Sequence, residues 1–480
     1  MPKRPKNRPR PEDRVPVVAR KRGNARGAKG HRNGRSVSER DSEEKSAAVP
    51  EWVKQAEEIR GRWPWVERSV WNERMLQALE NGVKGGKWFS LIDKVWNLDN
   101  LSAAWMKAWA NGGCAGVDGQ SIRQFTVSLS QQLERLHQEL KTGQYQPHPV
   151  RRHWIPKPGS TEPRPLGIPA VRDRIVQGAI RNVLEPIFER QFAEHSYGFR
   201  PGRGCKDALR RVDGLLNEGL NWVVDVDLKS YFDSIAHEGL MQRVAEHISD
   251  GRVLELLQQY LKAGVMDGMK GWEPTEKGTP QGAVISPMLA NLYLNPLDHR
   301  MAKAGYAMTR YADDFIVQCR SEAQAQAALQ FIQQWAEENG LEVHPTKTRI
   351  VDATRKGGFD FLGYHFERGM KWPRKKSLEK FKEAIRHQTH RKQGQSIGQV
   401  TAGLTPLLRG WFEYFKHSQP STFTELDGWV RGRLRSILRK QQGKKGRARG
   451  NDHRRWPNAY FDRLGFYSLV KARAMVLQSR

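Results

Sequence analysis

The chain has 480 residues and a formal net charge of +29, because 81 Lys and Arg stand against 52 Asp and Glu. This length predicts several domains, and this charge predicts a polyanionic partner, for which nucleic acid is the first candidate. The sequence has no run of about 18 apolar residues, no secretory signal and no paired cysteine spacing, which argues against a membrane protein, an exported protein and a zinc or disulfide scaffold, and fits a reducing cytoplasm.

The amino end predicts a disordered basic arm. Residues 1–50 hold 15 Lys and Arg and six acids, with almost no aromatic rings, so they cannot bury enough apolar area to offset the entropy of ordering. RNA binding and simple solvation both remain open for this arm. Three segments with apolar residues at helical spacing follow, and they predict helices over 65–82, 91–110 and 121–142.

Beyond residue 150 short apolar runs alternate with helical segments. The runs are rich in Val, Ile, Phe and Tyr and predict strands at 222–228, 311–318 and 359–366. Between and around them we expect helices over 171–190, 205–218, 238–248, 286–303 and 321–339. This interleaving predicts an α+β domain.

After residue 375 the chain reads as helical and basic. Residues 431–455 contain 11 Lys and Arg and a single acid. Three apolar residues share one helical segment with these cations, so one face can pack while the other meets phosphate; a merely solvated charged face is the alternative. The cations that we expect to contact nucleic acid here are Arg431, Arg435, Arg439, Lys444 and Lys445.

Two acidic segments carry the chemistry. In Tyr311-Ala312-Asp313-Asp314 adjacent carboxylates precede an apolar run, and they make sense at a hairpin turn if divalent cations neutralise them. A second predicted strand, 222–228, carries Asp227 near its end. If the two runs pair, Asp227 and Asp313 face one another and provide what a two-metal phosphoryl-transfer site needs, with ions roughly 3.5–4 Å apart.

Several motifs, in this order, resemble those of reverse transcriptases, and some resemble the enzymes of bacterial group II introns in particular. The likeness covers about residues 85–475. The segments that carry it are 154–158 (WIPKP), 164–169 (RPLGIP), 197–202 (YGFRPG), Asp227 with Phe232, 278–282 (GTPQG), 311–314 (YADD), 361–364 (FLGY), 409–411 (RGW), 456–461 (WPNAYF) and 465–469 (GFYSL).

This resemblance implies a right-hand polymerase that copies RNA into DNA with two Mg²⁺ ions, for which Mn²⁺ is a possible substitute. The implied partners are an intron RNA template, a DNA target or primer and deoxynucleoside triphosphates, in a bacterial cytoplasm without a membrane. The expected domains are a basic arm (1–50), a helical extension (51–84), fingers and palm (85–368), a helical thumb or maturase domain (369–440) and a basic DNA-binding-like tail (441–480).

The resemblance also assigns roles to single residues. Asp227 and Asp313 are expected to be metal ligands and Asp314 an auxiliary carboxylate. Phe232 matches a bulky ring that excludes the ribose 2′-hydroxyl. The other residues expected at the nucleotide are Lys157, Arg164, Gln281, Gly282 and Lys347, and Arg200 is expected to contact nucleic acid.

Two departures and two alternatives accompany this reading. The sequence lacks the paired cysteines of a carboxy-terminal endonuclease, so we expect the endonuclease-lacking class, and the basic amino arm is not part of the usual pattern. One alternative is a domesticated polymerase that serves its host. The other is a pure maturase with a dead polymerase, which the presence of both Asp227 and Asp313 disfavours.

Overall fold

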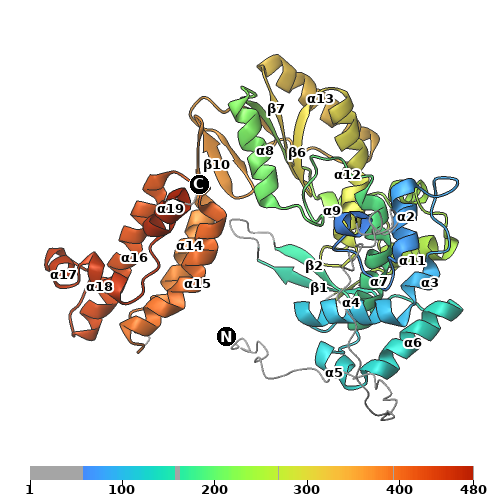
Figure 1. Ribbon diagram of the computed structural model, residues 1–480, viewed down its shortest axis with the longest axis horizontal. Helices are drawn as coiled ribbons and strands as arrows, with labels where there is room; N and C mark the ends of the chain where they lie inside the picture. The colour runs from blue at the N-terminus through green and yellow to red at the C-terminus, as the bar shows by residue number, and fades with distance from the viewer. Residues whose placement is uncertain (1–57, 157–162, 269, 393, 479–480) are drawn as a thin grey trace, which may run out of the picture. The chain divides into compact units, whose positions relative to one another are not determined.

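The computed structural model describes residues 58–156, 163–268, 270–392 and 394–478 (Figure 1). The predicted basic arm, and the first residues of the helical extension up to 57, lie outside this range. Among the described helices, none combines the length and the apolar character needed to cross a membrane.

The amino-terminal helices are shorter than their apolar spacing predicted. The helix expected over 65–82 begins only at α2 (Glu73–Asn81), where the Asn72 side chain accepts from the backbone N–H of Met75. The helix expected over 91–110 is broken into α3 and α4, because Asn97 caps a new helix through its side chain. Likewise 121–142 is two helices that meet at Ser128. Their bounds are α3 (Ile92–Val95), α4 (Leu98–Asn111), α5 (Ile122–Val127) and α6 (Leu129–Thr142).

A four-stranded sheet follows, in the order β2-β1-β4-β5. Its β1–β2 hairpin is antiparallel, and β1 runs parallel to β4. Figure 1 labels the two strands of this hairpin. The elements are β1 (Val150–Ile155), β2 (Arg164–Ile168), β4 (Val265–Asp267), β5 (Gly271–Glu273), α7 (Val171–Glu189), α10 (His237–Ala245) and α11 (Gly251–Lys262).

The central sheet has the order β6-β7-β3-β8, and all its neighbouring strands are antiparallel. Its strands alternate apolar side chains between two cores, so both faces are covered. Val224 and Phe315 pack in the core that includes α12 and α13, while Val223 and Ile316 pack with α8. The elements are β3 (Trp222–Val226), β6 (Ala307–Tyr311), β7 (Asp314–Cys319), β8 (Arg349–Asp352), α8 (Cys205–Asn217), α9 (Tyr231–Ser234), α12 (Ser286–Lys303) and α13 (Glu322–Glu338).

The segment 359–366, predicted as one strand, is a hairpin of two strands. The segment 311–318, also predicted as one strand, contains the turn between β6 and β7. Leu362 and Gly363 both have positive φ, +46° and +84°, and this turn separates β9 (Phe359–Phe361) from β10 (Tyr364–Glu367). β10 also pairs with β11 (Met370–Pro373) to complete a three-stranded sheet. The mixed α/β character and the hairpin turn at the adjacent acids were therefore predicted correctly, whereas the turn within 359–366 was missed.

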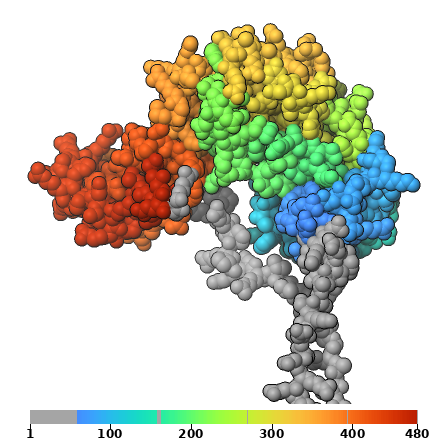
Figure 2. All heavy atoms as spheres, turned by 45° about the horizontal axis from the view of Figure 1, so that its top comes forward, coloured from blue at the N-terminus to red at the C-terminus, as the bar shows by residue number. Residues whose placement is uncertain are grey.

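The carboxy-terminal helices form a second core, coloured orange to red in Figure 2. Its large buried side chains include Phe412, Phe423 and Phe461. Two tyrosines tie these helices to the small sheet: the Tyr364 hydroxyl donates to the Tyr414 carbonyl and the Tyr414 hydroxyl to the Leu362 carbonyl, each at 2.6 Å. The helices are α14 (Lys375–Gln388), α15 (Ile397–Phe415), α16 (Pro420–Gln441), α17 (Gly450–Arg455), α18 (Asn458–Arg463) and α19 (Leu469–Gln478).

Candidate active site

Strand pairing brings the two acidic segments to one end of the central sheet. β3 runs antiparallel to β7, with Val226 opposite Phe315. Asp227 follows directly after β3, and Asp313 lies in the two-residue turn between β6 and β7, where Tyr311 pairs with Asp314. The two-metal site was expected only if these two segments pair, and the observed register meets that condition.

Asp227 is held by the segment that leads into β8. Its backbone N–H donates to the Thr348 hydroxyl at 3.2 Å, and its carbonyl accepts from the N–H of His344 at 2.8 Å. The ammonium of Lys347 lies 3.3 Å from a carboxylate oxygen of Asp227, and both side chains are about half exposed. Lys347 therefore stands beside the acid that the sequence assigned to the metal.

Burial and neighbouring negative charge oppose ionisation of both carboxylates of the turn. Burial raises the pKa of Asp313, and the negative charge of Asp227 raises it further, whereas the guanidinium of Arg164 lowers it. The Asp314 residue is exposed to solvent, but its carboxyl group is surrounded by many protein atoms. This partial loss of water, together with the charges of Asp225 and Asp313, raises the pKa of Asp314 to about 7.

Arg164 and the loop before α12 form a second wall near these acids. The Arg164 guanidinium donates to the side-chain oxygen of Gln281 at 2.6 Å, and the N–H of Gly167 donates to the Gln281 carbonyl at 2.7 Å. A Cβ on Gly282, which has φ +113°, would lie 2.5 Å from the Gly167 carbonyl oxygen. Only glycine permits this approach, so β2 and the loop are fixed against each other.

Phe232 lies five residues after Asp227 and is 8% exposed. Its ring packs edge-on to Tyr231, and its carbonyl accepts from the N–H of Thr279 at 2.8 Å. A Cβ on Gly278 would lie within 3.0 Å of backbone atoms of Phe232 and Asp233. The same glycine-containing loop that carries Gln281 therefore also fixes Phe232.

Comparison with known proteins identifies the family. Residues 155–366 match the family described as reverse transcriptase (RNA-dependent DNA polymerase), and residues 378–456 match the group II intron maturase-specific domain. Protein YkfC of Escherichia coli (strain K12) is 36% identical over 293 residues, which cover 53% of this chain and 76% of YkfC. The chain belongs to the group II intron-encoded reverse transcriptases. As a member of this family it is an RNA-directed DNA polymerase that depends on divalent metal.

Other relatives match over smaller shares of their length. The group II intron-encoded protein LtrA of Lactococcus lactis subsp. cremoris is 41% identical over 168 residues, 35% of this reverse transcriptase and 28% of LtrA. The putative COX1/OXI3 intron 1 protein of Saccharomyces cerevisiae is 33% identical over 210 residues, 44% of this chain and 25% of that protein. The matched segments thus span about a quarter of these two intron proteins.

The placement of Arg200 corrects its predicted contact with nucleic acid. Arg200 is 6% exposed. Its guanidinium pairs with Glu189 at 2.7 Å and donates to the carbonyls of Ala193 and Ser196. Because these partners all belong to the protein's interior and the side chain is enclosed, Arg200 braces the segment before α8 rather than meeting phosphate.

Two arginines of α16 are corrected for the same reason. Arg431 and Arg435 are 8% and 3% exposed; the first pairs with Asp427 and Asp462, and the second donates to the Trp456 carbonyl and to Asn458. Arg439 pairs with Asp452 at 2.9 Å but remains partly exposed, so its contact with nucleic acid stays a prediction. Of the five predicted cations in this region, Lys444 and Lys445 are exposed. Lys157, predicted at the nucleotide, lies outside the described residues.

Sequence reasoning passed over Asp225. It lies two residues before Asp227 and therefore on the same face of β3, and it pairs across the strands with Arg349 at 3.2 Å. Burial raises the pKa of Asp225, and Arg349 opposes that rise. The alternation Val-Asp-Val-Asp was the signal, because a strand that places two acids on one face concentrates their charge.

The donors at this end of the sheet suit a hard cation, because all are carboxylate oxygens. Among the described residues, no group of three or more His, Cys, Asp and Glu side chains is arranged to hold a metal by itself.

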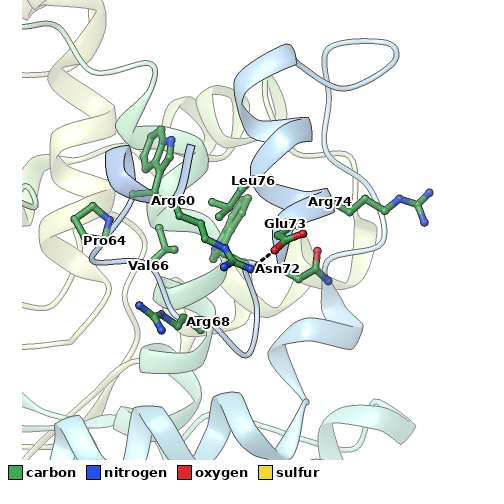
Figure 3. Close-up of a pocket in the computed structure, with 10 residues that line it drawn as sticks. Arg60, Pro64, Val66, Arg68, Asn72, Glu73, Arg74 and Leu76 are labelled. Carbon is green, nitrogen blue, oxygen red and sulfur yellow. Dashed lines mark hydrogen bonds and ion pairs between the residues drawn. The ribbon is translucent and has the colours of Figure 1, made fainter. Parts of the chain in front are cut away.

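A pocket of about 600 Å³ lies elsewhere, on the amino-terminal region (Figure 3). Its lining includes Arg60, which pairs with Glu73, and two tryptophans, Trp63 and Trp71. None of the acids at the end of β3 or in the β6–β7 turn lines it. That pocket is therefore separate from the candidate active site.

The raised pKa of Asp314 predicts how metal binding varies with pH. A carboxyl whose pKa is raised by folding favours the folded state while protonated, so the metal-free fold loses stability as pH rises from about 4 to about 7. A bound divalent ion must displace that proton and offsets the loss. We expect the increase in melting temperature at fixed Mg²⁺ to grow between pH 6 and pH 8, as measured by calorimetry.

The matched variant is Asp314→Asn, which is uncharged at every pH. Its Mg²⁺-induced increase in melting temperature should vary much less between pH 6 and pH 8. An equal pH dependence in the variant would contradict the assignment of this titration to Asp314.

Proposed function

We propose that this chain extends a primer along an RNA template by two-metal nucleotidyl transfer, with Asp227 and Asp313 as the metal ligands and Asp314 as an auxiliary carboxylate. The observation that carries the proposal is the β3–β7 register, which brings these acids to one strand end. The primer 3′-hydroxyl attacks the α-phosphorus of a deoxynucleotide, and pyrophosphate leaves.

Two Mg²⁺ ions would supply a lowered pKa for the attacking hydroxyl and charge neutralisation at the leaving group. The protein contributes position and electrostatics. Arg164 would hold the incoming triphosphate, since it already lies close enough to lower the pKa of Asp313. Lys347, which neutralises Asp227 in the metal-free protein, would turn to the departing pyrophosphate once a cation takes its place.

We further propose a right-hand arrangement in which residues 85–368 are fingers and palm, the helices from 369 are the thumb, and the tail begins near 441. In support, the reverse transcriptase match ends at 366, just before α14 begins a separate core. The maturase-specific match continues to 456, past the expected thumb boundary. Three free cysteines agree with the proposed cytoplasmic setting.

A cluster of cations on α14 and α16 is the best-supported surface for RNA in the maturase region. Lys382, Arg386 and Arg433 all lie within 6 Å of the ring of Trp429, which is partly exposed. The salt bridges of the described residues give these three cations no carboxylate partner. Like charges repel at this spacing, and phosphates would relieve that repulsion while the indole stacks on a base.

Assistance of intron splicing is part of the proposal, because binding RNA through this region needs no chemistry. A maturase without polymerase activity is the second candidate. The match to the maturase-specific domain favours a splicing role in addition to polymerisation, and the presence of Asp227, Asp313 and Lys347 at one site argues against splicing assistance as the sole role.

The central test is primer extension on an RNA template with deoxynucleotides and Mg²⁺. Asp313→Ala and Asp227→Ala should abolish synthesis, because each removes a metal ligand, while RNA binding stays nearly intact. Asp93→Ala, which removes an exposed acid on α3, is the matched control and should extend normally. Wild-type protein that folds and binds RNA but does not extend would support the pure maturase instead.

The sugar preference tests Phe232. We expect Phe232→Ala, and the milder Phe232→Val, to incorporate ribonucleotides, because the space below the ribose opens at the 2′ position. Phe192→Ala is the control, since Phe192 has the same 8% exposure in the same core and should lose similar stability without a change of selectivity. Unchanged selectivity in folded Phe232 variants would remove the assigned role.

The salt dependence of RNA affinity tests the cation cluster. The double variant Lys382→Ala with Arg386→Ala should bind RNA more weakly, and the slope of log affinity against log salt should fall by about 0.7 for each lost phosphate contact to a single strand. Arg135→Ala is the control, because Arg135 is exposed but paired with Glu139 on α6. Equal slopes in the two variants would exclude the cluster as the RNA surface.

A further inference from the structure

The turn that carries Asp313 has a demanding backbone. Ala312, the first residue of the turn, has φ +60°. This left-handed conformation is uncommon for a residue with a Cβ and persists only when its surroundings hold it. Since Asp313 is the next residue, whatever holds Ala312 also sets the direction of the Asp313 side chain.

Arg310 supplies that hold from the strand below. Its side chain is completely buried. One end group, Nη1, donates to the Ala312 carbonyl at 2.9 Å and to the Asn291 side-chain oxygen at 2.9 Å. Nε donates to Asp298 at 2.8 Å, and Nη2 completes a two-point pair with the same carboxylate. One planar guanidinium therefore joins the turn to two residues of α12.

The α12 residues that bind Arg310 also hold the segment that packs on the other side of the turn. Asn291 and Asp298 are seven residues apart and therefore lie on one face of α12, and the Asn291 amide donates to the Gly198 carbonyl at 2.6 Å. A Cβ on Gly198 would lie 2.2 Å from the backbone nitrogen of Ala312. The backbone of Arg310 also bonds to His195 and Tyr197. The glycine of the 197–202 motif is thus the surface against which the turn rests.

We propose that Arg310 is a positioning residue for the polymerase reaction: its contact with the Ala312 carbonyl, braced by Asn291 and Asp298, fixes the Asp313 carboxylate in its metal-binding direction. The inference rests on the proposed polymerase activity. A buried ion pair is seldom more stabilising than apolar side chains of equal volume, so stability alone does not account for a charged arginine here. The hydrogen bond from Arg310 to the Ala312 carbonyl, in a turn with positive φ, accounts for it.

The first variant is Arg310→Lys, assayed by steady-state primer extension. Lysine can still pair with Asp298, but one ammonium cannot reproduce the fork that also reaches Asn291 and the turn. We expect kcat to fall by at least about tenfold, since small misplacement of a reacting group has large effects on rate. KM for deoxynucleotide and affinity for template-primer should be unchanged, and the Mg²⁺ concentration for half-maximal activity should rise.

A second, paired variant separates positioning from folding. Arg310→Met with Asp298→Leu removes both charges, fills a similar volume and should recover the stability lost by either single change. It still leaves the Ala312 carbonyl without its donor, so kcat should remain low. Recovery of kcat together with the melting temperature would overturn the proposal, because the pair would then serve the fold only.

Arg435→Lys is the matched control. Arg435 is also a buried arginine with two polar partners, but it lies in the carboxy-terminal core and those partners are Trp456 and Asn458 rather than residues of the turn. It should lose stability and keep the wild-type kcat and Mg²⁺ dependence. If wild-type protein extends primers and Arg310→Lys behaves like this control, the positioning role is refuted; if wild-type protein does not extend, the proposed function itself fails.

Discussion

The antiparallel pairing of β3 with β7 is the constraint on which the rest of the site depends. It brings Asp225, Asp227, Asp313 and Asp314 to one end of a sheet whose two faces are covered by helices. Burial, together with the concentrated negative charge there, opposes ionisation and raises the pKa of Asp314. A site of this kind is unfavourable for the fold and favourable for a divalent cation, which is the usual relation between stability and function at a metal site.

Cations around this end divide into two kinds. Lys347 and Arg349 pair directly with Asp227 and Asp225 and remain about half exposed. Arg310 is fully buried and donates to Asp298, Asn291 and the Ala312 carbonyl. The exposed cations are free to exchange partners, whereas the buried one is held in a single geometry.

The strongly basic composition therefore has two physical uses. Arg200, Arg431 and Arg435 are internal, because a guanidinium can satisfy several carbonyls and a carboxylate at once. The cations about Trp429 have no carboxylate partner among the salt bridges of the described residues, although Arg433 donates to the carbonyls of Arg386 and Thr389. Net charge alone predicted a polyanionic partner, but it did not distinguish arginines that brace the fold from those on its surface.

The sequence by itself determined the family motifs, the α+β class, the helices α7, α12 and α13 to within about two residues, and the acids that meet at the site, because each depends on local spacing or on a short motif. Only the tertiary structure decided that 359–366 is a hairpin, that Arg200 is buried, and that Arg310, Asn291 and Gly198 support the catalytic turn. These features arise from contacts between segments far apart in the chain. Local periodicity carries no information about such contacts, because burial and pairing depend on what the fold brings alongside each side chain.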